Sequence, residues 1–596
     1  MKIALAQQNY HIGDFDRNVR KILDGISEAK RAGADLVVFT ELCVCGYPPR
    51  DFLEFEDFIA QCYAAVDRIR QAADTIGVII GGPARNTARE GKDLFNAAWL
   101  LYEKEIKGVA HKTCLPTYDV FDENRYFEPG YQHRVIPFKG KKIALTICED
   151  IWNLGDNPLY RVCPMDELIG QHPDLMINIS ASPFDYDHDD DRKEVVRLNV
   201  LKYKLPMFYC NAVGSQTEIV FDGGSLIYDA AGNLLHELKY FEEDLLLADT
   251  DEQGPVDSGT ILPGEGGAVP PLYEELLPGL SVATGAGSQP GTTLNKEMRV
   301  SRVEDPDKVI EYLVLDNNIR QIHTALILGI RDYFSKMGFT KAILGSSGGI
   351  DSAVTLALAC EALGKENVHA ILLPSPYSTA HSVSDAELLS QRLGNPYEIL
   401  PIREVYESFL HTLKPVFRDL PFSLAEENLQ SRTRGNILMA IANKFGYILL
   451  NTSNKSELAT GYGTLYGDMA GGLSVLGDVY KLQVYALARY INRQNEIIPA
   501  NILHKAPSAE LRPDQKDSDS LPEYEILDKV LYQYIERRKG PKEIVAMGID
   551  EALVKRVLRL VNVNEYKRNQ FCPIIRVSSK AFGVGRRMPI VGKYLS

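Results

Sequence analysis

Residues 341–363 read KAILGSSGGIDSAVTLALACEAL, and this stretch decides the fold of the second half of the chain. A short apolar strand, Ala342–Leu344, leads into a turn of Gly and Ser, and an apolar helix follows. The free N–H groups at the start of a helix, reached past small residues, form a cradle for an anion such as phosphate. Asp351 falls in the first helical turn, where a carboxylate can hold Mg²⁺ against phosphate. We therefore expect a nucleotide-binding strand–loop–helix unit within an α/β domain.

This loop differs from the commonest phosphate loops. No G-x-x-x-x-G-K-[ST] segment occurs in the chain, so the pattern is not that of a P-loop NTPase. Segments such as GEGGAV and GYGTLYG lack the last small residue of a G-x-G-x-x-G fingerprint. An ordinary glycine turn is the alternative for any SGG, but a complete SGGIDS between a strand and a helix favours the phosphate site.

A second signature lies at residues 141–153, KKIALTICEDIWN, where an apolar strand ends directly before Cys148. A sharp junction at this point would surround the thiol with free backbone N–H groups, which stabilise a thiolate and an oxyanion. A catalytic cysteine also needs a base. The strand Leu36–Phe39 leads to Glu41, and the segment Leu101–Val109 leads to Lys112. A buried structural thiol remains the alternative for Cys148 taken alone.

Length and composition restrict the class of protein. The 596 residues exceed a single core, which indicates two large domains or three. The net charge of −15 argues against nucleic-acid or membrane-surface binding, and no apolar stretch approaches the roughly 18 residues of a membrane span. The nine cysteines form no framework, and the isolated pair Cys43 and Cys45 is typical of buried thiols rather than a metal site. We expect a cytoplasmic protein whose first residues are not a signal peptide.

The chain divides into two α/β regions. Residues 1–250 alternate helical segments (Asn18–Ala32, Asp57–Thr75) with short apolar runs that predict strands: Lys2–Ala6, Leu36–Phe39, Val78–Ile80, Ala97–Leu101, Ile143–Ile147, Leu175–Ile179 and Met207–Cys210. Residues 251–305 are rich in Gly, Pro, Ser and Thr, and we expect an interdomain linker there. Residues 306–596 form the second region, which begins with a predicted helix over Val309–Met337.

Four segments of the first region, AQQNYHIGDFDRN, FTEL, HKTCLP and ICEDIW, resemble the nitrilase superfamily of carbon–nitrogen hydrolases in order and spacing. The resemblance implies a four-layer αββα sandwich in which Glu41 is the general base, Lys112 the oxyanion stabiliser and Cys148 the nucleophile. It also implies a supporting role for Glu123, for which a surface acid is the alternative. Members that use glutamine bind it near the positions of Tyr118, Ser182 and Arg192, where loop or interface roles remain alternatives.

The second region resembles ATP pyrophosphatases of the PP-loop type, which carry SGGxDS on a doubly wound parallel sheet. The segments LPSPYSTAHSVSDA, EENLQSRTRGNILMAIAN, NKSELATGYGTLYGDMAGG, KAPSAELRPDQ and KAFGVGRR look like those of NAD synthetases. With the nitrilase-like half in front, the whole chain resembles the family of bacterial glutamine-dependent NAD⁺ synthetases. That resemblance implies ATP, deamido-NAD⁺ and glutamine as substrates, Mg²⁺ as cofactor, and a homodimer or larger homo-oligomer.

The same resemblance assigns residues of the second site. ATP would contact Ser347, Gly348, Gly349, Ile350, Asp351, Ser352 and Thr452, and Mg²⁺ would bind Asp351 and Glu457. Deamido-NAD⁺ would contact Asn428, Glu457, Asp468 and Lys567. Arg432 and Lys481 match basic positions near the phosphates. Helix-surface polarity is the alternative for Asn428 and Arg432, and Lys455 is interpreted as a solvated lysine.

The C-terminal segment, residues 566–596, contains seven Lys and Arg and no Asp or Glu. Apolar residues are interspersed among these charges, so we expect a folded segment that closes over phosphates rather than a solvated tail. The loop KAPSAELRPDQKD should cover the ATP site, although Ser518 replaces an acidic residue that is common in the family and leaves the role of this loop open.

Two coupled reactions follow from these assignments. Cys148 would hydrolyse glutamine, and the second site would adenylate the nicotinate carboxylate of deamido-NAD⁺ before ammonia attacks it. The alternatives are another PP-loop glutamine amidotransferase, a stand-alone amidase and a non-catalytic nucleotide-binding sensor.

Overall fold

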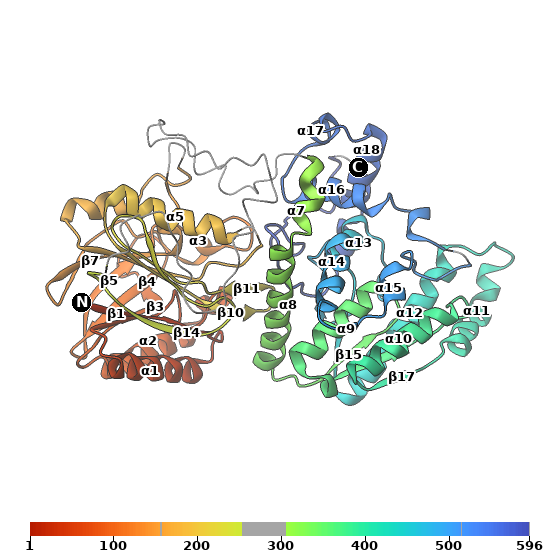
Figure 1. Ribbon diagram of the computed structural model, residues 1–596, viewed down its shortest axis with the longest axis horizontal. Coiled ribbons are helices and arrows are strands. Elements are labelled where there is room, and N and C mark those ends of the chain that lie inside the picture. Colours follow the sequence, from red (N-terminus) through yellow and green to blue (C-terminus); the bar gives the residue numbers. More distant parts are fainter. Residues whose placement is uncertain (155–157, 187, 253–305, 514, 595–596) are drawn as a thin grey trace.

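The computed structural model describes residues 1–594 except 155–157, 187, 253–305 and 514. Figure 1 shows two α/β regions side by side, the first in red to yellow and the second in green to blue. Nearly all of the predicted linker, 251–305, lies outside the described residues, so that prediction is not tested. Among the described helices, none is long and apolar enough to cross a membrane.

The first region contains two six-stranded sheets that pack face to face. Their strand orders are β14-β1-β2-β3-β4-β5 and β13-β12-β9-β8-β7-β6. Side chains alternate along each strand: Ile3 and Leu5 of β1 enter the core between the sheets, whereas Ala4 of the same strand faces the helix side. Helices α1 and α2 cover one outer face, and α4 and α5 cover the other. The expected four-layer αββα sandwich is confirmed.

The elements of this region agree with the predicted strands and helices to within a few residues at most ends. Helix α1 begins after Asp14, whose side chain accepts a hydrogen bond from the Arg17 N–H. In chain order the elements are β1 (Lys2–Gln7), α1 (Phe15–Arg31), β2 (Leu36–Val38), η1 (Arg50–Glu54), α2 (Glu56–Ala72), β3 (Gly77–Arg85), β4 (Leu94–Tyr102), β5 (Glu105–His111), α3 (Glu123–Tyr126), β6 (Ile136–Phe138), β7 (Lys141–Ile147), η2 (Cys148–Ile151), α4 (Pro164–Leu168), η3 (Ile169–Gln171), β8 (Leu175–Ser180), α5 (His188–Tyr203), β9 (Met207–Asn211), β10 (Val213–Gln216), β11 (Ile219–Asp222), β12 (Leu226–Tyr228), β13 (Leu234–Glu237) and β14 (Asp244–Asp249).

The second region is built on a five-stranded sheet of order β17-β16-β15-β18-β19, in which every neighbouring pair is parallel. Ile343 of β15 packs with α12 on one face, and Leu344 packs with the larger core on the other. Helices therefore cover both faces, and the expected doubly wound sheet is confirmed. The chain proceeds from β15 to β16 on one side and returns to β18 on the other, so a ligand crevice is expected at the carboxyl end of β15.

The elements of the second region are η4 (Pro306–Lys308), α7 (Val309–Leu313), α8 (Asp316–Met337), β15 (Ala342–Gly345), α9 (Ile350–Leu363), η5 (Lys365–Asn367), β16 (Val368–Leu372), α10 (Ala380–Leu393), β17 (Tyr397–Ile399), α11 (Arg403–Phe417), α12 (Leu424–Phe445), β18 (Ile448–Asn451), α13 (Lys455–Thr460), β19 (Leu473–Ser474), α14 (Lys481–Ile491), α15 (Ala500–His504), η6 (Asp517–Asp519), α16 (Tyr524–Ile535), α17 (Pro541–Ala546), α18 (Glu551–Val563) and α19 (Glu565–Arg568).

The single helix predicted over Val309–Met337 is wrong, because it is divided into α7 and α8. Leu315 takes an extended conformation with ψ 135° between them, and Asn318 Nδ2 donates to the Tyr312 carbonyl at 3.0 Å. This side-chain bond satisfies a carbonyl at the end of α7, so the interruption leaves that backbone group paired.

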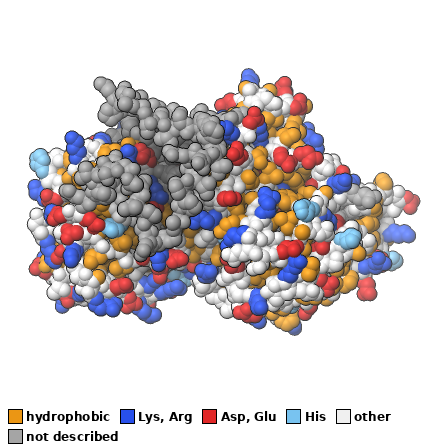
Figure 2. Space-filling view, viewed as in Figure 1, with side chains coloured by type: hydrophobic (Ala, Val, Ile, Leu, Met, Phe, Trp, Pro, Cys, Tyr) orange, Lys and Arg blue, Asp and Glu red, His pale blue; other side chains and the backbone are white. Residues whose placement is uncertain are grey.

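Helix α8 stands at the junction of the two regions, beside β10 and β11 (Figure 1). Apolar residues from both sides, including Phe184 and Val220 of the first region, join the core of the second. The two regions therefore share buried apolar surface. On the face drawn in Figure 2, acidic and basic side chains are intermingled over both regions.

Candidate active sites

The first site brings an ammonium group and two carboxylates together below the surface. Lys112 Nζ lies 2.7 Å from Glu41 Oε1 and 2.7 Å from Glu123 Oε1, and all three side chains are buried. Burial lowers the pKa of Lys112, but the charges of Glu123 and Glu41 outweigh this effect and leave it well above its ordinary value. The lysine is therefore a fixed cation. The surface-acid alternative for Glu123 is wrong.

Donors from three other segments fix the two carboxylates. Asn96 Nδ2 donates to Glu41 at 2.7 Å and to Glu123 at 3.2 Å, and the Ala181 N–H donates to Glu41 Oε2 at 3.0 Å. The Tyr47 hydroxyl donates to Glu123 Oε1 at 2.8 Å. The sequence analysis missed Asn96, although an Asn inside the apolar strand LFNAAWLLY is the kind of signal that marks a buried polar contact.

Cys148 is the first residue of the turn after β7, as predicted. Its φ of +42° lies in the left-handed region, which is unusual for a residue with a side chain. Burial raises the pKa of the Cys148 thiol well above its ordinary value, and the nearby charge of Glu41 adds to the effect, whereas Lys112 opposes it. The resting thiol is therefore protonated, and a base must remove its proton before it can attack.

The three residues expected to bind glutamine lie in different surroundings. The Tyr118 hydroxyl donates to Glu149 Oε2 at 2.9 Å, and Glu149 directly follows Cys148 in the sequence. The Ser182 N–H donates to Asn211 Oδ1 at 2.9 Å. Arg192 forms a buried, two-pronged ion pair with Asp222, with both contacts at 2.8 Å. All three assignments stay predictions, and Asp222 already compensates the charge of Arg192.

The second site is a cavity of about 280 Å³ at the carboxyl ends of the parallel strands. It lies at the crevice expected from the strand order. Its lining includes these residues assigned from the sequence: Ser347, Gly348, Gly349, Ile350, Asp351, Ser352, Thr452, Glu457, Asp468 and Lys481. The loop before Asp517 also lines the cavity, from Lys505 to Leu511, so its predicted place beside this site is confirmed.

Hydroxyl groups and one obligatory glycine shape the SGGIDS loop. Ser352 Oγ accepts from the Ser347 N–H at 3.2 Å and donates to the Gly349 carbonyl at 3.0 Å, which folds the loop onto the first turn of α9. Gly348 has a φ of +77°, and a Cβ there would lie 2.1 Å from the Ser382 carbonyl oxygen. Only glycine fits this position.

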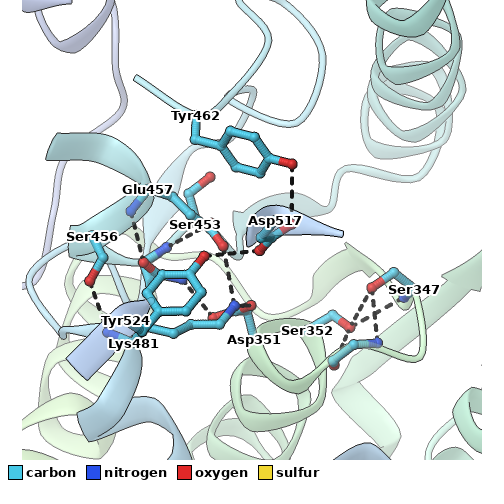
Figure 3. A network of polar contacts seen from close by, with 12 residues as sticks. Ser347, Asp351, Ser352, Ser453, Ser456, Glu457, Tyr462, Lys481, Asp517 and Tyr524 are labelled. Carbon is cyan, nitrogen blue, oxygen red and sulfur yellow. Dashed lines mark hydrogen bonds and ion pairs between the residues drawn. The ribbon is translucent and has the colours of Figure 1, made fainter. Parts of the chain in front are cut away.

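Lys481 lies between two carboxylates in this cavity (Figure 3). Its Nζ is 2.5 Å from Asp351 Oδ2 and 3.3 Å from Glu457 Oε1. Asn454 Nδ2 donates to the other oxygen of Asp351 at 2.9 Å. Burial, together with the charge of Asp351, raises the pKa of Glu457 to about 8. A pair of partly buried carboxylates that already attracts a cation is a donor set that suits Mg²⁺, which prefers oxygen ligands.

Asp517, which the sequence analysis did not assign, approaches the same cluster. Its carboxylate accepts from the hydroxyls of Tyr462 at 3.1 Å and Tyr524 at 2.9 Å (Figure 3). Asp517 is the last residue of the segment KAPSAELRPDQKD and directly precedes Ser518, where the sequence departs from the family pattern. The departure therefore lies next to a buried carboxylate.

The remaining predicted substrate contacts gather around the loop 461–468, outside the cavity lining except for Asp468. The Thr464 hydroxyl donates to Asn428 Oδ1 at 2.7 Å, and Lys567 Nζ donates to the carbonyls of residues 461 and 463 at 2.8 Å. Arg432 Nε donates to the Leu465 carbonyl at 3.2 Å. Arg434, which the sequence analysis missed, lines the cavity instead.

The structure places Lys455 differently from the sequence-based prediction. We predicted a solvated lysine, but the side chain has no exposed surface and its Nζ lies 2.9 Å from Asp478 and 2.8 Å from Glu536. It is the first residue of α13, the helix that carries Glu457. Its polar neighbours in the sequence gave no sign of burial.

The C-terminal segment is folded through part of its length. Ile574, Ile575 and Phe582 are buried, which confirms a packed segment, and none of its described residues, 566–594, lines the cavity of the second site. Arg576 reaches Asp119 of the first region instead, at 2.7 Å. The expectation that this segment closes over phosphates stays a prediction.

Comparison with known proteins agrees with this two-site arrangement. Residues 2–254 match the carbon–nitrogen hydrolase family, and residues 322–571 match NAD synthase. The chain is 41% identical over 595 residues to the glutamine-dependent NAD(+) synthetase of Synechocystis sp., covering 99% of this chain and 98% of that protein. The chain belongs to the glutamine-dependent NAD⁺ synthetase family.

Other members of the glutamine-dependent NAD⁺ synthetase family match over the same length. The synthetase of Thermotoga maritima is 40% identical, and the alignment covers 100% of this chain and 99% of that protein. A solved structure of the Acinetobacter baumannii synthetase, in complex with adenosine diphosphate, is 34% identical with a TM-score of 0.70 and covers 99% of this chain and 98% of that one. Both the family and the α/β fold expected from the sequence are confirmed.

Proposed function

We propose that the chain converts deamido-NAD⁺, ATP, glutamine and water into NAD⁺, AMP, pyrophosphate and glutamate. The observation that carries this proposal is the presence of two chemically different sites in one chain, the first buried and the second an open cavity. One has a cysteine beside a carboxylate–lysine cluster, and the other has an anion cradle beside paired carboxylates. The family membership and the relative solved with adenosine diphosphate support the same reading.

The first site supplies ammonia. Glu41 takes the proton of the Cys148 thiol, and the thiolate attacks the side-chain carbonyl carbon of glutamine. Lys112 offsets the negative charge that develops on the carbonyl oxygen, and the proton held by Glu41 passes to the departing nitrogen. Water then cleaves the thioester and releases glutamate. Glu123 keeps Lys112 in place and ionised, because its carboxylate lies 2.7 Å from Nζ.

The second site activates the acceptor. A carboxylate is a poor electrophile, so the nicotinate carboxylate of deamido-NAD⁺ attacks the α-phosphorus of ATP and displaces pyrophosphate. Ammonia then attacks the adenylate and displaces AMP. The N–H groups and hydroxyls of Ser347–Ser352 would bind phosphate oxygens, and Asp351 and Glu457 would hold Mg²⁺, which offsets the phosphate charge when bound. Lys481 adds a fixed positive charge.

A second copy of the chain is the proposed partner. Helix α11 and the segment that follows it expose apolar side chains on the second region: Val405, Phe409, Val416, Leu420, Phe422 and Leu424. Val416 and Leu420 are 72% and 75% exposed. Exposed apolar side chains that gather on one element favour self-association. Sedimentation velocity should detect a dimer or larger oligomer that Leu420→Glu dissociates, whereas Val591→Glu, at an exposed C-terminal position, should leave it intact.

The function is tested by supplying deamido-NAD⁺, ATP and Mg²⁺ with either glutamine or ammonium, and by measuring NAD⁺ and AMP. We expect NAD⁺ and AMP in equal amounts from either nitrogen source. No NAD⁺ from either source would refute the synthetase assignment. Glutamine hydrolysis without NAD⁺ formation would instead favour another amidotransferase or a stand-alone amidase.

A further inference from the structure

One buried carboxylate, Asp150, connects the two backbone segments that carry the nucleophile and the lysine of the first site. Its Oδ1 accepts hydrogen bonds from the N–H groups of Thr113 at 3.0 Å and Cys114 at 2.9 Å, directly after Lys112. Its Oδ2 accepts from the N–H of Ile147 at 3.1 Å, directly before Cys148. The side chain is only 2% exposed. A single carboxylate thus links the backbone directly before Cys148 to the backbone directly after Lys112.

The turn that carries Cys148 needs such support. A residue with a side chain is strained when its backbone is held in the left-handed region, and this conformation persists only where the surroundings enforce it. Cys148 is in that region, and the hydrogen bond from Ile147 to Asp150 closes the turn around it. The backbone at Lys112 also has a support of its own, because the Lys112 N–H donates to the Asn96 carbonyl at 2.8 Å.

The chemistry of the side chain matters as much as its position. A buried carboxylate is unfavourable unless hydrogen bonds or a cation compensate it. Within the part of the chain that the structure describes, no Lys or Arg forms an ion pair with Asp150, so its three N–H donors and the more distant charge of Lys112 carry the compensation. An asparagine has the same shape but only one accepting oxygen. Whichever way the amide is turned, its NH₂ group would face another donor: either the N–H groups of Thr113 and Cys114 or the N–H group of Ile147.

We propose that Asp150 is a positioning residue for the glutaminase reaction, which holds the Cys148 turn and the Lys112 segment at a fixed separation. It touches no reacting atom. The inference rests on the proposed function, because it assigns Asp150 to the glutamine-hydrolysing step and to no other. The ATP-dependent step, in the other region of the chain, should not depend on it.

Asp150→Asn removes one of the two accepting oxygens that link the Cys148 turn to the Lys112 segment, with little change in side-chain volume. We expect kcat for glutamine hydrolysis to fall by about 100-fold, because a displacement near 1 Å between catalytic groups has an effect of that size. KM for glutamine should change little, since Asp150 contacts no substrate. Alkylation of Cys148 by iodoacetamide should slow, because a displaced Glu41–Cys148 pair transfers the thiol proton less readily. The rate of NAD⁺ synthesis from ammonium should stay within about twofold.

Asp229→Asn is the matched control. Asp229 is also a buried carboxylate, and its Oδ1 accepts from the N–H groups of Ala231 and Asn233, both at 2.9 Å, in the turn between β12 and β13. If loss of such hydrogen bonds acted only through stability, both variants would lower the melting temperature and affect glutamine hydrolysis alike. We expect the effect on kcat only in Asp150→Asn.

Asp150→Glu separates position from charge and provides a second variant if Asp150→Asn folds poorly. It keeps both accepting oxygens but moves them by one methylene, so kcat should again fall. Full activity in Asp150→Glu, or wild-type kcat in folded Asp150→Asn, would overturn the inference. Loss of ammonium-dependent synthesis from a folded Asp150→Asn protein would overturn it as well. If the wild-type chain hydrolyses no glutamine, the proposed function itself fails.

Discussion

Lys455 pairs one ammonium group with two buried acidic side chains, Asp478 and Glu536. Its Nζ also donates to the Ser578 hydroxyl at 2.8 Å and lies 4.6 Å from the centre of the Tyr480 ring. Asp478 in turn accepts from the N–H groups of residues 577 and 578, both at 2.8 Å. The first turn of α13 is therefore tied to the C-terminal segment. Such a buried polar cluster makes the fold more rigid only while each of its polar groups has a hydrogen-bond or ion-pair partner.

Lys455→Met should destabilise the chain by about 3–5 kcal/mol, because Asp478 and Glu536 would remain buried without a cation. The urea midpoint of the unfolding transition measures this loss. Lys555→Met is the control: Lys555 forms an i,i+4 pair with Glu551 on an exposed helix surface, and its removal should change stability by no more than about 0.5 kcal/mol. Equal midpoints for the two variants would contradict the structural role of the buried cluster.

At the scale of elements, the strand–loop–helix unit of residues 342–363 depends on one backbone conformation. Gly348 takes a positive φ in close contact with Ser382 at the start of α10. The loop hydroxyls then close onto the first turn of α9. The SGGIDS motif, the positive φ of Gly348 and its place in the cavity lining are therefore all consistent with the phosphate-binding loop expected from the sequence.

Gly348→Ala should reduce ammonium-dependent NAD⁺ synthesis on the order of 100-fold, because the new Cβ forces the phosphate loop away from Ser382. Gly338→Ala is the matched control. Gly338 has a similar φ of +74° at the end of α8, but a Cβ there would meet no atom within 4 Å. Both variants strain the backbone, and only the first should lose activity. Comparable activity in the two would show that the loop tolerates displacement.

Local pattern predicts the elements and both motifs, but not the contacts between distant segments. Cys148 and Asp351 were found because each follows an apolar strand, and strand ends are where sheets present side chains to a crevice. The burial of Lys455 depends on partners 23 and 81 positions away, as the numbering of Asp478 and Glu536 shows, and no local pattern encodes that. The same holds for Arg434 and Asp517, which reach the cavity only after the chain folds back.

For the whole molecule, the junction between the two regions is polar at one end of α8. Asp332 accepts from Asn9 Nδ2 at 2.7 Å and from the Ser215 N–H at 2.6 Å. Lys336 Nζ lies 3.2 Å from Asp332 and donates to Asn9 and to the Ser215 carbonyl, both at 2.7 Å. Arg576 pairs with Asp119 elsewhere on this junction. Charged contacts thus fix how the two regions dock.

Burial lowers the pKa of Lys336 to about 8, despite the nearby Asp332, while Arg17 and Lys21 add to the lowering. An unfolded lysine has a pKa of about 10.4. Between these values the unfolded state binds the proton that the folded state has released, so this group makes stability rise with pH, by at most about 1.4 kcal/mol per unit. Unfolding midpoints measured from about pH 8 to about pH 10 should therefore rise for the wild type relative to Lys336→Met. A constant difference would contradict this assignment.

The two sites should be separable by single substitutions. Cys148→Ala should abolish NAD⁺ synthesis from glutamine and preserve synthesis from ammonium, because only the first site uses the thiol. Asp351→Ala should stop synthesis from both sources, since it lies in the cavity that would hold ATP. Product formation is measured with each nitrogen source in turn. Loss of both activities in Cys148→Ala would mean that the two regions do not work independently.

The burial of Cys148 also bears on how the protein survives oxidative conditions. Peroxides and electrophiles react with an exposed thiolate, whereas Cys148 is only 5% exposed and burial raises the pKa of its thiol, which favours the protonated form. On the proposed mechanism, its proton leaves only when Glu41, a carboxylate buried from solvent, accepts it. Burial and protonation should therefore slow irreversible oxidation of Cys148 between turnovers, through the same geometry that would prepare it for attack.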